Sequence, residues 1–242
     1  MRKAYAALGW RIENFRPTLS SLGDIEALLR PPPRVDLVHV PCFRQRDLPA
    51  AVRYARRHGI RILFDPLISS YDKQVFERQK ISPESPAARR LLAKERKLFQ
   101  SADRLIADTP VHADFFAETL GVRRERLSVV YVGAEEPLFS PGEASQAPDT
   151  QPLEVLFYGS FIPLHGAEVI TEAAQLYEGP PVHWWFIGNG PARKRCEASL
   201  HAMDNVTFED WVDYRELPAR IRHADVVLGI FGTTQKAGRV IP

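Results

Sequence analysis

Three segments in the second half of the chain combine glycines with residues able to bind an anion. The first, "YGSFIPLHG", spans residues 158–166 and leads from an apolar run into a helical pattern. Gly159 and Gly166 permit a tight turn whose backbone N–H groups lie at a helix start, where a phosphate is favoured. Ser160 and His165 stand beside these glycines, and a bound phosphate would favour the protonated imidazole. A lone histidine at a helix start is more often an ordinary surface residue.

A second turn, "FIGNGPARKR", spans residues 186–195 and places Gly188 and Gly190 between an apolar segment and a helical one. It resembles the start of a dinucleotide-binding fingerprint, and Asp210 follows at about the distance that this fingerprint requires. Arg193, however, stands where the third glycine would be. By itself this turn is a weak indication of a nucleotide ligand, and it leaves a nicotinamide cofactor open.

The third turn ends at Lys236, which is either a phosphate contact or a plain surface lysine. Trp211 follows a separate apolar segment and could pack on a nucleotide base, although tryptophans more commonly lie in the core. The other residues of the third turn that could line a ligand are Phe231, Gly232 and Thr233.

In the first half of the chain, Asp65 follows an apolar run in "FDPLISSYDK", residues 64–73. An aspartate at the end of a strand can act as a base, accept a hydrogen bond from a sugar hydroxyl or cap a helix. The chain contains no D-x-D, H-E-x-x-H, Walker A or G-x-S-x-G motif. A metal–diphosphate site of the D-x-D type is therefore not supported, and no metal is expected.

The elements that must position these residues alternate between short apolar runs and helical patterns, which indicates α/β architecture with parallel sheets. The expected strands are 36–40, 60–64, 104–108, 127–132, 153–158, 183–187, 205–209 and 225–231. The expected helices between them are 47–59, 85–102, 167–177, 191–202 and 214–224. We therefore predict two doubly wound, Rossmann-like domains.

A proline-rich segment, 137–152, reads as a linker between an N-terminal domain over 1–136 and a C-terminal domain over 153–242. The chain opens on a helical pattern over 2–9 and a strand pattern over 10–15. A doubly wound domain usually opens on a strand and a glycine-rich turn instead. We expect an N-terminal domain without its first strand, an incomplete C-terminal domain and hence a fragment.

Composition sets broad limits on the protein class. The chain has 242 residues, of which 45% are hydrophobic and 26% charged, as in a packed globular protein. No apolar run reaches the length of a membrane span, and no secretory leader is evident. Cys42 and Cys196 match no metal or redox spacing, so buried thiols and a cytoplasmic location are expected.

Charge is divided unevenly along the chain. Residues 1–140 carry 24 Lys and Arg against 17 Asp and Glu, whereas residues 141–242 carry 8 against 13. The basic part could attract a phosphate-bearing molecule or could simply be solvated surface. Residues 88–99 could form a helix lying on the inner membrane face, but an ordinary helix packed on its sheet is the commoner case. Nucleic-acid binding is not expected, because the basic residues lack interleaved aromatics.

The ordered set of motifs resembles the GT-B glycosyltransferases of family 4. The matching segments are "FDPLISSYDK", "RLIADTPVHADFFAETLGV", "LSVVYVGAEEPLF", "VLFYGSFIPLHGAEVITEAAQL", "FIGNGPARKR", "NVTFEDWV", "ADVVLGIFG" and "KAGRVIP". The resemblance implies a retaining, metal-independent enzyme that moves a sugar from a nucleotide-sugar to a glycan or lipid-linked acceptor. A role in bacterial cell-surface polysaccharide synthesis would follow.

The resemblance also implies roles for the residues singled out above. The donor would occupy the second domain, with its diphosphate on the loop 159–166, and the acceptor would occupy the first. His165 would stabilise the leaving diphosphate, and Asp65 would orient the acceptor or the sugar. Family members often carry an arginine and a lysine where this chain has Ser160 and His165, so diphosphate stabilisation should be weaker or pH-dependent.

Two other interpretations stay open from the sequence. The family's paired glutamates lie around and beyond "FGTTQKAGRVIP", and this chain has no glutamate after Glu216. A degenerate, non-catalytic nucleotide-binding protein is therefore one alternative. An NAD-dependent oxidoreductase that uses "GNGPAR" is the other, and binding of UDP or GDP rather than NAD would separate it from a glycosyltransferase.

Overall fold

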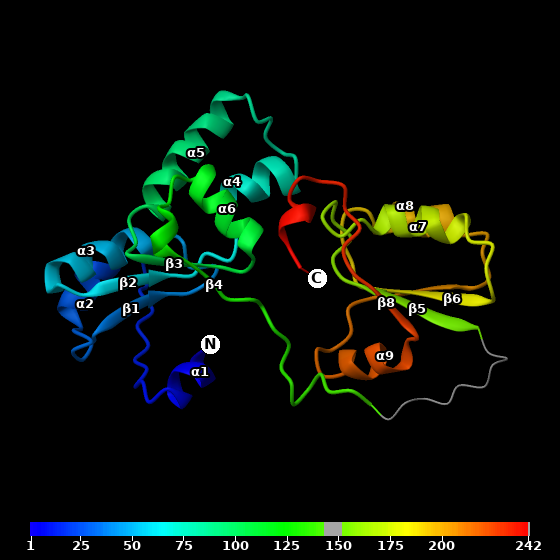
Figure 1. Ribbon diagram of the computed structural model, residues 1–242, viewed down its shortest axis with the longest axis horizontal. Helices are drawn as coiled ribbons and strands as arrows, with labels where there is room; N and C mark the ends of the chain where they lie inside the picture. The colour runs from blue at the N-terminus through cyan, green and yellow to red at the C-terminus, as the bar shows by residue number, and fades with distance from the viewer. Residues whose placement is uncertain (143–151, 242) are drawn as a thin grey trace. The chain divides into compact units, whose positions relative to one another are not determined.

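A computed structural model of the chain describes residues 1–142 and 152–241, which divide into two compact units (Figure 1). The first unit comprises Met1–Tyr71 and Pro83–Tyr131, and the second comprises Asp72–Ser82 and Val132–Pro242. The short segment 72–82 thus belongs to the second unit although it lies within the sequence of the first. The expected boundaries, with domains 1–136 and 153–242, remain a prediction, and most of the expected linker, 143–151, falls outside the described residues.

The first unit is built on four parallel strands in the order β1-β2-β3-β4. Each of the strands β2, β3 and β4 pairs with the strand that precedes it in sequence. For example, Leu37 of β1 lies opposite Arg61 of β2. Figure 1 shows helices α3, α5 and α6 along one face of this sheet. The elements are α1 (Arg2–Ala7), η1 (Ser20–Leu22), α2 (Gly23–Leu29), β1 (Leu37–Val40), α3 (Leu48–His58), β2 (Arg61–Phe64), α4 (Ser70–Asp72), α5 (Pro86–Phe99), β3 (Arg104–Ala107), α6 (Pro110–Glu118), η3 (Arg124–Arg126) and β4 (Leu127–Val129).

Local sequence explains where helices α5 and α6 of the first unit begin. Ser85 caps α5 by accepting a hydrogen bond from the backbone N–H of Ala88. Thr109 caps α6 in the same way, and in both helices a proline follows the capping residue. A proline at the first helical position costs no hydrogen bond, because the N–H that it lacks would have no partner there.

The core of the first unit is aromatic. The ring of Phe99 packs edge-on against Phe64 at 5.3 Å and against Phe116 at 5.1 Å, and all three side chains are fully buried. Phe99 is the last residue of α5, and Leu91 and Leu92 of the same helix are half-buried. The helix expected over 88–99 therefore packs its apolar side on the protein's own sheet. This agrees with the interpretation as an ordinary helix rather than as a helix lying on a membrane.

The second unit contains a second sheet of four parallel strands, ordered β7-β6-β5-β8. The chain runs outward from β5 to β7 and then returns to the opposite side of β5. Figure 1 shows α7 and α8 on one face of this sheet and α9 on the other. The elements are η2 (Lys73–Glu77), β5 (Leu153–Tyr158), α7 (Ala167–Gln175), β6 (Val182–Ile187), α8 (Arg193–Leu200), β7 (Val206–Glu209), α9 (Leu217–His223), β8 (Val226–Leu228) and η4 (Ala237–Arg239).

The two faces of the second sheet differ in chemistry. One face carries a buried apolar cluster that includes Phe157, Trp184 and Phe186, packed beneath α7 and α8. The opposite face carries polar and aromatic side chains: Trp185 donates a hydrogen bond to Glu209, and the guanidinium of Arg220 on α9 lies over the Trp185 ring. This alternation along each strand follows from the two-residue period of β structure.

The predicted α/β class with two parallel, Rossmann-like sheets is confirmed, and all eight strands form within two or three residues of the expected bounds. The strand expected over residues 10–15 is wrong. This segment is irregular, with Trp10, Ile12 and Phe15 all exposed. An alternating apolar pattern forms a strand only where another strand offers hydrogen-bond partners, and among the described strands none pairs with it.

A cavity of 610 Å³ lies in the first unit along the edge strand β1. Its walls come from β1, α2, α3 and the irregular residues 13–17. Two polar atoms that are buried without a hydrogen-bond partner among the described residues belong to its lining residues, namely His39 Nε2 and Asp47 Oδ1. Burial also lowers the pKa of His39, aided by the charge of the chain's first amino group, so this imidazole is neutral.

No helix in the described parts of the chain combines the length and the apolar character needed to cross a bilayer.

Candidate functional site

The predicted anion-binding turn connects β5 to α7 in the second unit. β5 ends at Tyr158, the chain turns at Gly159 and α7 starts directly after Gly166, whose φ of 68° lies in the left-handed region. The backbone N–H groups of the first turn of a helix have no carbonyl partners within the helix. The carbonyl of Gly166 accepts hydrogen bonds from Val169 and Ile170, so among the described residues the N–H groups of Ala167 and Glu168 are the ones that could bind a ligand.

The three glycine turns pack against one another at the carboxyl ends of the strands. A Cβ atom added at Gly188 would lie 2.1 Å from the carbonyl oxygen of Gly159. One added at Gly166 would lie 2.3 Å from the carbonyl carbon of Phe231, in the third turn. Gly190 and Gly232 likewise lie against the backbone of the first turn. The structure therefore brings together all five glycines that the sequence singled out.

This position is also where the strand order of the second sheet reverses. The turn after β5 and the turn after β8 stand side by side, because these two strands are paired: the chain runs from β5 outward to β7 on one side and returns to β8 on the other side of β5. Ligands of open parallel sheets bind at such a reversal, outside the carboxyl ends of the strands. The backbone N–H of Phe231 donates to the carbonyl of His165 at 3.1 Å, which ties the two turns together.

Arg193 explains why the second turn departs from a dinucleotide fingerprint. Its guanidinium donates to the carbonyls of Gly188 and Glu209 and to the carboxylate of Asp210. Asn189 donates to the same carboxylate at 3.1 Å. In the fingerprint the third glycine lets the helix approach the strand closely. Here an arginine side chain fills that place and fastens the turn to the end of β7 by hydrogen bonds.

His165 is half-buried between the first and third turns. Burial lowers the pKa of its imidazole, while a hydrogen bond to the backbone carbonyl of Ser160 and the charge of Glu77 raise it by smaller amounts. In the empty site the ring is therefore neutral at pH 7. A phosphate bound beside it would act in the opposite direction and favour the imidazolium.

This balance predicts a pH-dependent affinity for diphosphate. The pKa of His165 should be higher with inorganic pyrophosphate bound than without it, so binding takes up a proton. Affinity should rise as the pH falls through the pKa of the complex and should level off below the pKa of the empty site. Calorimetric titrations of the wild type and of His165→Gln between pH 5 and 8, together with an NMR titration of the ring, would measure this.

The ligand's own protonation affects both proteins equally, so the difference between the two pH profiles isolates His165. Superimposable profiles would show that this imidazole does not face the diphosphate.

Aromatic side chains border the glycine turns. Trp211 follows β7 and is 59% exposed, and Phe231 follows β8 and is 45% exposed. Thr233 is also exposed, whereas Ser160 is half-buried. Exposed aromatic rings beside a backbone-lined turn are suitable for packing on a nucleotide base.

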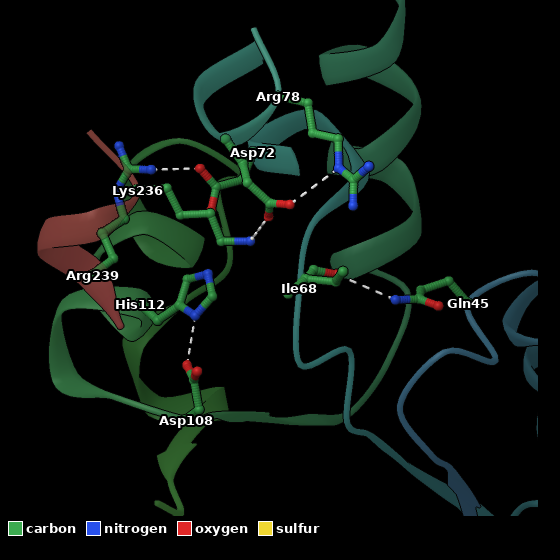
Figure 2. A network of polar contacts seen from close by, with 9 residues as sticks. Gln45, Ile68, Asp72, Arg78, Asp108, His112, Lys236 and Arg239 are labelled. Carbon is green, nitrogen blue, oxygen red and sulfur yellow. Dashed lines mark hydrogen bonds and ion pairs between the residues drawn. The ribbon is translucent and has the colours of Figure 1, made fainter. Parts of the chain in front are cut away.

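Lys236, which the sequence predicts to be either a phosphate contact or a plain surface lysine, lies in a buried ion pair. Its Nζ lies 2.6 Å from Oε2 of Glu77, and the two side chains are 2% and 6% exposed (Figure 2). Glu77 comes from the segment 72–82, which also contributes Asp72 to a second ion pair, with Arg239. No local sequence pattern indicates this cluster, because its acidic and basic members lie about 160 positions apart.

The residue expected to act in the first unit, Asp65, lies at the carboxyl end of β2. Burial raises the pKa of its carboxyl, a hydrogen bond from the backbone N–H of Leu67 lowers it, and the nearby carboxylate of Asp108 raises it again. Asp108 follows β3 just as Asp65 follows β2, and it lies 2.5 Å from Nδ1 of the buried His112. The same strand-end rule that selected Asp65 would have found Asp108.

His165 and Asp65, the two residues expected to be catalytic, thus belong to different units, and each is positioned by its own sheet. Over the described ranges 1–142 and 152–241, His, Cys, Asp and Glu side chains form no group of three or more that could hold a metal ion. Independence of metal remains a prediction. Cys196 is buried, Cys42 is half-buried, and both are free thiols.

The sequence of the chain is similar to that of a known protein family. The model of the glycosyl transferase 4-like domain matches residues 3–133, which is more than half of the chain. The chain belongs to the glycosyltransferase 4-like family.

Two curated glycosyltransferases are similar in sequence to this glycosyltransferase 4-like chain. The D-inositol 3-phosphate glycosyltransferase 1 of Catenulispora acidiphila is 30% identical over 161 residues, 63% of this chain and 37% of that protein. The D-inositol 3-phosphate glycosyltransferase of Mycolicibacterium smegmatis is 29% identical over 148 residues, 55% of this chain and 33% of that protein.

Solved structures support the GT-B fold for this glycosyltransferase 4-like chain. HepE of Anabaena, solved with UDP and glucose, aligns with a TM-score of 0.61 at 15% identity, over 93% of this chain and 62% of that one. Sucrose-phosphate synthase of Thermosynechococcus elongatus aligns with a TM-score of 0.63 at 18% identity, over 90% and 58% respectively. The chain thus spans about a third of the length of the curated relatives and about three fifths of these structures.

Proposed function

We propose that this chain provides the donor and acceptor units of a nucleotide-sugar glycosyltransferase. The observation that carries the proposal is the convergence of three glycine turns at the start of α7, where the strand order of the second sheet reverses. The N–H groups of Ala167 and Glu168 would bind the diphosphate of the donor, and Trp211 would pack on its base. HepE of Anabaena, whose fold matches, was solved in complexes with UDP and with UDP-glucose.

In this proposal the protein promotes transfer chiefly by stabilising the leaving group. As the bond between the sugar and the diphosphate breaks, negative charge develops on the phosphate oxygens. Backbone N–H groups fixed before the reaction stabilise that charge without having to reorganise. His165 would take up a proton from solvent when the diphosphate binds, and the imidazolium would then donate a hydrogen bond to the oxygens on which charge develops. Asp65, at the end of β2, would orient the acceptor or the sugar.

The acceptor in this proposal is a phosphate-bearing glycan or lipid-linked molecule. Residues 1–140 carry a net charge of +7, counted from 24 basic and 17 acidic residues. The matched relatives include an inositol phosphate glycosyltransferase. Retention at the transferred sugar, bacterial cell-surface polysaccharide synthesis and a cytoplasmic location at the inner membrane face belong to the same proposal. Family resemblance supports these parts.

The second turn disfavours binding of an NAD cofactor, because the groups that would contact the cofactor are already hydrogen-bonded within the protein. The carbonyl of Gly188 and the end of β7 are occupied by the guanidinium of Arg193, and Asp210, the residue that would accept the ribose hydroxyls, is already hydrogen-bonded to Asn189. The family membership of the chain points the same way.

A panel of nucleotides tests the proposal directly. We expect UDP, GDP or ADP, or one of their sugar derivatives, to stabilise the purified chain without added metal. A ligand at 100 times its Kd should raise the free energy of unfolding by about 2.7 kcal/mol. Thermal unfolding with each ligand, repeated with the metal chelator EDTA, measures this effect. Stabilisation by NAD alone would refute the proposal, and so would a folded chain that responds to none of the nucleotides.

A further inference from the structure

A buried ion-pair cluster lies against the glycine turns of the second unit. Lys236 and Arg239 enter it from the end of the chain, and Asp72 and Arg78 enter it from the segment 72–82 (Figure 2). At its centre the ammonium of Lys236 lies 2.6 Å from Glu77 Oε2. Neither side chain of this pair is more than 6% exposed, so the lysine is held by the carboxylate and is not presented to solvent.

Glu77 is held in place by an unusual stretch of backbone. It ends the π-helical turn η2, whose five residues are closed by a hydrogen bond from the N–H of Arg78 to the carbonyl of Lys73. The Nε of Arg78 also lies 3.3 Å from Glu77 Oε1. Both carboxylate oxygens therefore have cationic partners. Such turns are rare and occur frequently at functional sites.

The cluster shares a wall with the predicted diphosphate site. Glu77 is close enough to His165 for its charge to raise the pKa of that imidazole against the larger effect of burial. The loop that leads to Lys236 also lies directly on the first turn, since a Cβ atom on Gly232 would meet the carbonyl oxygen of Leu164 at 2.2 Å. A diphosphate bound to the N–H groups at the start of α7 would thus lie beside Lys236, whose ammonium is already paired with Glu77.

We propose that Glu77 is an internal competitor of the donor diphosphate for Lys236, and that it sets how tightly the site holds the diphosphate product. This inference rests on the proposed function. The carboxylate keeps the ammonium hydrogen-bonded and neutralised when the site is empty. A bound diphosphate draws the ammonium toward itself, and Glu77 takes it back when the product leaves. Such competition weakens binding of the charged part of the ligand and leaves binding of the nucleoside unchanged.

The experiment compares a charged probe with a neutral one. Inorganic pyrophosphate and uridine are titrated calorimetrically into the wild type, Glu77→Gln and Glu77→Asp at low ionic strength. Glutamine keeps an oxygen for the lysine to bond but removes the negative charge. We expect Glu77→Gln to bind pyrophosphate roughly tenfold more tightly, with a difference that shrinks as salt is added, because salt screens the charge interactions. Glu77→Asp and the binding of uridine should stay near the wild type.

A matched variant separates this role from a structural one. In the Lys236→Gln variant, Glu77 has no ammonium to release to the ligand. Adding Glu77→Gln to this variant should therefore leave its affinity for pyrophosphate unchanged. Unchanged or weaker pyrophosphate binding by the folded Glu77→Gln variant would overturn the inference. A wild type that binds none of the nucleotides would instead refute the proposed function itself.

A measurement on the wild type covers the case in which Glu77→Gln does not fold. The Nζ resonance of Lys236, assigned by its loss in Lys236→Arg, should shift when pyrophosphate is added and stay in place when uridine is added. A resonance that does not move while the His165 ring signals report bound pyrophosphate would overturn the inference.

Discussion

Replacing Gly166 by alanine is expected to abolish nucleoside diphosphate binding and to destabilise the second unit. At a φ of 68° a side chain costs about 1–2 kcal/mol. The added Cβ would also lie 2.3 Å from the carbonyl carbon of Phe231 and 2.4 Å from the backbone nitrogen of Gly232, so the third turn must move. Overpacking of this kind costs about 1–3 kcal/mol. Together these effects should lower the free energy of unfolding by about 2–5 kcal/mol.

Denaturant titration followed by tryptophan fluorescence measures this change well, because Trp184, Trp185 and Trp211 all lie in the second unit. Gly133→Ala is the matched control, since a Cβ at that glycine meets no atom within 4 Å. A Gly166→Ala protein that kept wild-type stability and UDP affinity would mean that the first and third turns are not packed as described.

Replacing Lys236 by methionine should be similarly damaging, for an electrostatic reason. The change leaves the carboxylate of Glu77 buried, with Arg78 at 3.3 Å as its remaining cationic partner in the part of the chain that the structure describes. Removing one partner of a buried ion pair typically lowers the free energy of unfolding by about 3–5 kcal/mol. The double variant Lys236→Met with Glu77→Gln removes both charges and should recover most of that loss.

The same denaturation measurement forms a double-mutant cycle with these variants and Glu77→Gln. Near-additive losses, with no recovery in the double variant, would show that the two side chains do not interact in solution.

The strands could be predicted because each has a strong local signal. Apolar runs such as "LEVLFY" are bounded by glycine, proline or charged residues, and the carboxyl end of each strand then marks where ligands bind. The same rule predicts that Gly159, Gly188 and Gly232, which each follow such a run, lie at one edge of a sheet. Helix α6 could also have been found, since Thr109 followed by Pro110 is a typical helix start.

Other features had no local signal. The pattern over residues 10–15 is that of a strand, but strand formation depends on a partner that the pattern does not describe. Helix α2 has only seven residues, too short for a clear helical period. Glu77 lies in a polar stretch that resembles any solvated surface, and its burial depends on Lys236, 159 positions away. Long-range charge pairing of this kind leaves no periodicity to detect.

The segment 72–82 has a consequence for how the chain matures on the ribosome. The second unit is discontinuous in sequence, and its first piece is synthesised long before the residues that neutralise it. Glu77 precedes Lys236 by 159 positions, and Asp72 precedes Arg239 by 167. At about 5–20 residues per second, roughly 8–30 s pass before Lys236 and Arg239 are made. The two long-range ion pairs can form only then, so the second unit can reach its final packing only after Lys236 and Arg239, which follow its last strand, have been translated.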